Sequence, residues 1–223
     1  MSSIAENLNA IGSTLPREGV ELVAVSKFHP VNALAEAYAT GQRSFGESRA
    51  FEMRDKAAAL PHDISWHFIG HLQTNKVKTV VPVASLIHSI DSERLLLAVN
   101  AEAERIGKNV DVLLQVHVAR EDTKFGFSPD ELIRLVTPDL ISSLHRTHIT
   151  GIMGMASNTE DTDRIRADFR AIRSCFDTLS AEAFNGDPAF RTVSMGMSHD
   201  YLIAIDEGST MVRVGSAIFG DRI

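Results

Sequence analysis

A lysine follows an apolar segment near the amino end of the chain, in the sequence VAVSKFHP at residues 23–30. Residues 20–25 are almost wholly apolar, as expected of a strand covered on both faces. Pro30 suits the first turn of a following helix. The amine of Lys27, placed at such a strand end, has the chemistry to form a Schiff base with an aldehyde. On their own, these residues are more typical of a lysine that simply leaves the core at a strand end.

Two segments near the other end of the chain have the composition of a phosphate site, TVSMGMS at 192–198 and GSTMVRVGSAIFG at 208–220. In each, a short apolar run leads into glycines and hydroxyl residues. Glycines let the backbone approach a ligand closely, and N–H groups at a turn bind phosphate. Arg213 adds a fixed positive charge. Either segment alone fits an ordinary strand–helix connection, but barrels often bind phosphate in their last two such loops.

Short apolar runs alternate with longer amphipathic ones, which predicts eight strand–helix units. A single (β/α)8 barrel would place the active groups at the carboxyl ends of its strands. Periodicity alone fits an open, doubly wound sheet equally well. The predicted strands are 21–26, 44–46, 65–69, 86–90, 111–118, 148–153, 192–195 and 211–214. The predicted helices are 31–39, 47–59, 74–80, 92–106, 129–136, 162–179 and 201–207, with a final turn near Ala217.

Composition narrows the class of protein. A chain of 223 residues that is 44% hydrophobic can bury a substantial core, and we expect one domain over residues 1–223. The net charge of −7 argues against nucleic-acid and anionic-membrane surfaces. The lone Cys175 excludes an intramolecular disulfide and fits a reducing cytoplasm. Residues 1–15 do not have the pattern of a secretory signal, and no apolar stretch has the length of a membrane span.

The chain resembles the pyridoxal-phosphate homeostasis protein family, which is related to the amino-terminal barrel of alanine racemase. This resemblance favours the barrel over the open sheet. Asparagine is usual in the family where this chain has Ser48, and residues 116–122 are less typical of it. The matching segments are VSK at 25–27, FGE at 45–47, WHFIGHLQTNK at 66–76, HSID at 88–91, KFGF at 124–127, GIMGM at 151–155 and residues 194–222.

The resemblance implies a site for pyridoxal 5′-phosphate (PLP), held as a Schiff base on Lys27. It places Arg213 at the pyridine nitrogen, although an arginine bound to the phosphate is an alternative, and Ser48 near the ring. Lys124 either approaches the phenolic oxygen or is a solvated loop lysine. No metal cluster is expected. The implied phosphate residues are Ser194, Gly215 and Ser216, with Gly196 and Met197 close by.

The resemblance also implies a function, a cytoplasmic protein that holds PLP and delivers it to PLP-dependent apo-enzymes. The alternative is a PLP-dependent amino-acid racemase. In the related racemases a tyrosine from a second domain is the base opposite the lysine. This chain ends at Ile223, soon after the eighth predicted strand, and its tyrosines, Tyr38 and Tyr201, occupy no obvious position for that role. We therefore expect a monomeric binding protein without robust turnover, with PLP and amino acids as ligands.

A third reading, a protein-interaction barrel without cofactor, would leave Lys27 and the two phosphate-type loops unexplained.

Overall fold

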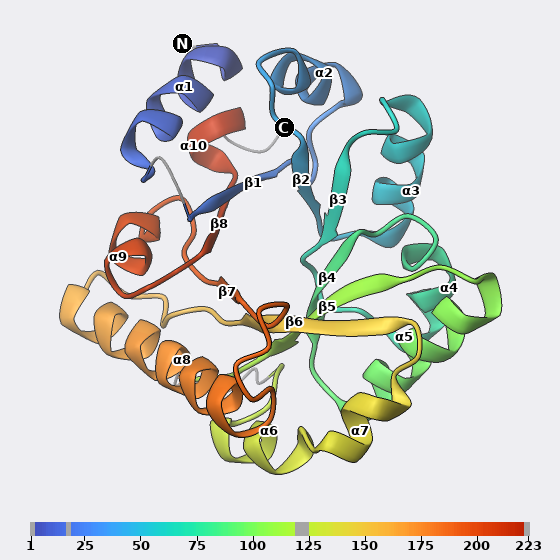
Figure 1. Ribbon diagram of the computed structural model, residues 1–223. Helices are drawn as coiled ribbons and strands as arrows, with labels where there is room; N and C mark the ends of the chain where they lie inside the picture. The colour runs from blue at the N-terminus through green and yellow to red at the C-terminus, as the bar shows by residue number, and fades with distance from the viewer. Residues whose placement is uncertain (1–2, 17–18, 119–124, 221–223) are drawn as a thin grey trace.

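Eight parallel strands close into a barrel in chain order, which confirms the predicted (β/α)8 fold (Figure 1). The structure is a computed structural model and describes residues 3–16, 19–118 and 125–220. Helices surround the barrel. The strands are β1 Glu21–Val25, β2 Ser44–Glu47, β3 Ser65–Phe68, β4 Leu86–Ile90, β5 Val110–Gln115, β6 Thr147–Met153, β7 Thr192–Ser194 and β8 Met211–Val214.

The helices confirm most of the sequence prediction, with two additions and two boundaries shifted by three residues, of which one is the end of α8 at Glu182 and not at residue 179. The additions are α1 and α7; α1 begins at a capping box formed by Ser3 and Glu6. Helix α3 begins at Ala50 and not at residue 47, because Glu47 is the last, buried residue of β2. The helices are α1 Ile4–Thr14, α2 Val31–Ala39, α3 Ala50–Ala59, η1 Thr74–Lys76, α4 Val77–Val80, α5 Glu93–Ile106, α6 Pro129–Leu135, α7 Pro138–Ser143, α8 Thr162–Glu182, α9 Tyr201–Asp206 and α10 Ser216–Phe219.

The barrel closes where β1 pairs with β8, with Val23 opposite Arg213. Helix α1 packs against α2 and α10 beside this closing pair (Figure 1). The Asn7 side chain donates to the Ile218 carbonyl at 2.9 Å, and the Ile4 N–H donates to Glu36 Oε1 at 3.1 Å. Helix α1 therefore links the first and last strand–helix units.

The barrel interior is filled by side chains that point inward from alternate strand positions. An apolar cluster there consists of Val23, Leu86, Leu113, Met153 and Met211. Polar side chains share the interior with it and extend toward both mouths of the barrel. None of the described helices is both long enough and apolar enough to cross a membrane.

Candidate functional site

A cavity of about 540 Å³ opens at the carboxyl ends of the strands and brings both predicted regions together. Lys27, which follows β1, lies on its wall together with Arg213 of β8. Three further predicted residues line the same cavity, Met197, Gly215 and Ser216. The remaining wall is formed by Val25, His29, Ile69, Met155, Ser198, His199 and Gly220.

The Arg213 guanidinium is held by hydrogen bonds to two backbone carbonyls and one hydroxyl. Its NH1 donates to the Ser194 carbonyl at 2.8 Å and to Ser194 Oγ at 2.6 Å, while NH2 donates to the Gly154 carbonyl at 3.1 Å. Burial lowers the pKa of Arg213 to about 10, so the guanidinium keeps its charge at neutral pH. Ser194 is fully buried under this arginine and is absent from the cavity wall. The structure thus gives Ser194 contacts that orient Arg213.

The loops after β7 and β8 fit an anionic group. Gly196 adopts φ of 97°, and a Cβ there would lie 2.6 Å from Ala204 Cβ. Its carbonyl accepts from the Arg213 N–H at 3.0 Å, which ties the two loops together. The Gly215 N–H donates to Ser198 Oγ at 3.1 Å. Ser216 begins α10, whose first N–H groups have no acceptor within the helix. Hydroxyls, backbone N–H groups and a buried guanidinium are the donors that a phosphorylated ligand requires.

Ser48 lies apart from this wall. It lines a neighbouring cavity of about 660 Å³ with Arg49, His71 and Lys76, among others. The loop carrying Ser48 passes close to Gly70, where a Cβ would lie within 2.4 Å of the Ser48 carbonyl oxygen. Lys124 lies outside the described residues.

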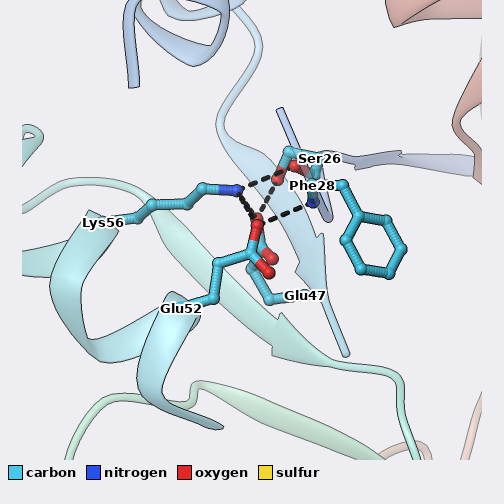
Figure 2. A network of polar contacts seen from close by, with 5 residues as sticks. All are labelled: Ser26, Phe28, Glu47, Glu52 and Lys56. Atoms are coloured by element: carbon cyan, nitrogen blue, oxygen red, sulfur yellow. Dashed lines mark hydrogen bonds and ion pairs between the residues drawn. The ribbon is translucent and has the colours of Figure 1, made fainter. Parts of the chain in front are cut away.

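A buried network holds the backbone on both sides of Lys27 (Figure 2). Lys56 Nζ donates to Glu47 Oε1 at 2.7 Å, to Glu52 Oε1 at 2.7 Å and to the Ser26 carbonyl at 2.8 Å. The Ser26 hydroxyl donates to Glu47 Oε1 at 2.6 Å. The Phe28 N–H donates to Glu52 Oε1 at 2.7 Å. We call Glu47, Glu52 and Lys56 the carboxylate–lysine clamp; it fixes Ser26 and Phe28, the neighbours of Lys27.

The clamp supports an uncommon backbone conformation and buries charge. Phe28 adopts φ of 71°, in the left-handed region that bulky residues rarely enter. Burial raises the pKa of Glu47, while hydrogen bonds from Lys56 and Ser26 oppose that rise. Glu47 Oε2 is buried without a hydrogen-bond partner. The sequence does not predict the clamp, because Glu47 falls within the predicted helix at 47–59, although Glu52 and Lys56 have the i,i+4 spacing of a helical ion pair.

Both tyrosines lie away from the cavity that contains Lys27. Tyr38 Oη donates to Asp63 Oδ1 at 2.8 Å, and Tyr201 Oη lies 3.0 Å from Thr14 Oγ1. Cys175 is a buried core thiol, and burial raises its pKa to about 11. Within the described ranges, no group of three or more His, Cys, Asp or Glu side chains could hold a metal ion.

Comparisons with known proteins extend over the whole chain. A sequence model of the family "Alanine racemase, N-terminal domain" matches residues 1–223. A protein of Schizosaccharomyces pombe named pyridoxal phosphate homeostasis protein is 39% identical over 230 residues, covering 100% of this chain and 94% of that protein. A human protein of the same name is 36% identical over 219 residues, covering 93% of this chain and 78% of the human one.

Solved structures are also similar to this chain over nearly its whole length. PipY of Synechococcus elongatus with PLP bound superimposes with a TM-score of 0.88 at 37% identity, covering 98% of this chain and 100% of PipY. Alanine racemase from E. faecalis superimposes with a TM-score of 0.76 at 20% identity, covering 98% of this chain and 57% of the racemase. The likeness to the racemase is one of fold.

Proposed function

The chain belongs to the alanine racemase N-terminal domain family, and on that premise we propose that it is a PLP-binding protein of intracellular PLP homeostasis. It holds PLP covalently on Lys27 and delivers it to PLP-dependent apo-enzymes in the cytoplasm. The shared name of relatives that match the full length of the chain supports this proposal, as does the PLP bound by PipY. We assign residues 1–223 to a single PLP-binding domain that acts as a monomer.

The proposal rests on one observation: Lys27, Arg213, Gly215 and Ser216 all line the same cavity. The Lys27 amine condenses with an aldehyde, forming a C=N bond and releasing water. Gly215 and Ser216 supply donors for the phosphate, while Gly196, Met197 and Ser194 support them from the adjoining loop. Arg213 faces the pyridine nitrogen and disfavours its protonation. We place the Ser48 side chain beside the pyridine ring, although Ser48 itself lines the neighbouring cavity.

Covalent attachment is tested by borohydride reduction of the PLP-loaded protein followed by peptide mass spectrometry. The adduct is expected on Lys27, and Lys27→Ala should abolish it. Lys76→Ala is the matched control, because Lys76 lines the neighbouring cavity and should not affect the adduct. An adduct on another lysine of the wild-type protein, with Lys27 unmodified, would refute the assignment.

The alternative function is amino-acid racemisation. A racemase on this site would need a second acid–base group opposite Lys27, and both tyrosines are engaged elsewhere, with Asp63 and Thr14. We therefore propose that amino acids react with the bound cofactor without robust turnover. The assay is solvent deuterium incorporation at the α-carbon with chiral analysis of the product. Exchange with inversion at about 1 per second or faster would favour the racemase, whereas transfer of PLP to an apo-enzyme without exchange supports homeostasis.

A further inference from the structure

Four buried polar side chains form a continuous line through the middle of the barrel. They are Arg213 of β8, Ser194 of β7, His88 of β4 and His67 of β3. Arg213 NH1 lies 2.6 Å from Ser194 Oγ, and Ser194 Oγ lies 3.1 Å from His88 Nδ1. His88 Nε2 lies 3.0 Å from His67 Nδ1. None of the four residues is more than 5% exposed.

The line connects the two mouths of the barrel. At one end, Arg213 forms part of the wall of the cavity that contains Lys27. At the other end, His67 Nε2 lies 3.1 Å from Ser65 Oγ and 3.8 Å from Glu21 Oε1. Glu21 and Ser65 are the first residues of β1 and β3, and with His67 they line a cavity of about 450 Å³. The polar contacts thus span the barrel from one end of its strands to the other.

The charged groups at the two ends favour one direction for the hydrogen bonds between them. A guanidinium can only donate, and a carboxylate can only accept. Both imidazoles between them are neutral at pH 7, because burial lowers the pKa of His67 to about 4 and that of His88 well below its ordinary value. A neutral imidazole has one nitrogen that donates and one that accepts. Each histidine therefore donates to one neighbour in the line and accepts from the other.

We propose that His88 and His67 are positioning residues for Ser194 and Arg213, and that both imidazoles carry their hydrogen on Nε2. His67 Nε2 donates to Ser65 Oγ at 3.1 Å, and the negative charge of Glu21, 3.8 Å away, favours the hydrogen on that nitrogen, which leaves Nδ1 to accept from His88 Nε2. The bare His88 Nδ1 then accepts from the Ser194 hydroxyl. Ser194 Oγ then accepts from Arg213, as it must, because a guanidinium can only donate.

This arrangement has a consequence for the cofactor site. Hydrogen bonds in a chain polarise one another, and the low dielectric of the interior strengthens that effect. A change of charge at Glu21 therefore alters the hydrogen bonding of Arg213 on the far side of the barrel. The tautomers and the coupling concern the protein alone, whereas the effect on PLP binding rests on the proposed function.

The first test uses 15N-histidine NMR of the full chain without PLP. The expected result is a neutral imidazole protonated at Nε2 for both His67 and His88. Glu21→Gln should shift the signals of both imidazoles and of the Arg213 guanidinium. Asp111→Asn is the matched control, since Asp111 lines the same distal cavity and pairs with His148 at 3.2 Å. A hydrogen on His88 Nδ1, or equal shifts in the two variants, would overturn the proposal.

The second test measures PLP affinity by equilibrium titration. His88→Leu should weaken binding about tenfold, because Ser194 loses its acceptor and Arg213 its fixed position. His88→Asn keeps an acceptor for the Ser194 hydroxyl and should recover most of the affinity. Equal losses in a folded Leu variant and a folded Asn variant would indicate a packing role and refute the positioning role. Absence of PLP binding by the wild-type protein would refute the proposed function while leaving the NMR result intact.

Discussion

Replacement of Lys56 by methionine tests whether the carboxylate–lysine clamp holds the turn that carries Lys27. The side chain of Lys56 is 6% exposed and that of Glu47 is fully buried, and their 2.7 Å ion pair has little access to water. Methionine has a similar length but cannot donate a hydrogen bond. Lys56→Met therefore leaves the Glu47 carboxylate with the Ser26 hydroxyl alone, since Glu47 Oε2 already has no partner.

The expected loss in free energy of unfolding at neutral pH is about 3–5 kcal/mol, the usual cost of removing one member of a buried ion pair. The loss should shrink as the pH falls. Burial holds the pKa of Glu47 above its ordinary value of 4.5, and loss of Lys56 removes a group that lowers it. A carboxyl with a raised pKa binds protons more tightly in the folded state, so the stability of the variant decreases as the pH rises above about 4.5.

The assay is urea unfolding of the wild type, Lys56→Met and the double variant Glu47→Gln/Lys56→Met at pH 5 and pH 8. The double variant removes the unpaired charge and should recover much of the loss. Lys78→Met, on an exposed lysine, is the control and should change stability by no more than about 0.5 kcal/mol. An equal deficit for Lys56→Met at both pH values, or a double variant as unstable as the single one, would refute the reasoning.

Three further outcomes are expected. Gly196→Ala should cost about 1–3 kcal/mol in urea unfolding, because φ is 97° and Ala204 Cβ lies in the way; Gly12→Ala, in open space within α1, should be neutral or stabilising. Cys175 should resist a thiol reagent at pH 8 until the protein is unfolded, because its pKa is raised to about 11; fast labelling of the native protein would contradict this. Pyridoxal should bind much more weakly than PLP, and Ser216→Asp should repel PLP as a second anion; equal affinities in equilibrium titration would argue against the phosphate loops.

Most strands could be predicted from sequence because they are short apolar runs, and the bounds of β4 and β8 agree with the prediction at both ends. Closure of the barrel could not, because β1 and β8 pair across almost the whole chain and local periodicity contains no record of that contact. The resemblance supplied it. Helix α1 precedes β1 and belongs to no strand–helix unit, so the alternating pattern does not predict it, although Ser3 and Glu6 have the spacing of a capping box.

Part of the candidate site could be predicted, in that residues far apart in the sequence meet at one cavity. Lys27, Arg213, Gly215 and Ser216 line one cavity, as their sequence context indicated. The clamp was not predictable, because it joins Glu47 at the end of β2 to two residues of helix α3. The line from His67 to Arg213 was not predictable either, because it depends on which side chains of the strands point inward. A shift of one residue in β4 would turn His88 out of the barrel, and sequence fixes such a register only loosely.

The pairing of β1 with β8 has a consequence for synthesis in the cell. Lys27 is translated well before Arg213 and Gly215, which lie 186 and 188 residues further along the chain. Long-range pairing of this kind is slow to form, and domains generally fold as units during translation. The nascent chain thus contains Lys27 before the other wall of the cavity is made. If PLP binds as proposed, we expect binding to require completion of β8, and a stalled chain truncated before Met211 should fail to retain PLP.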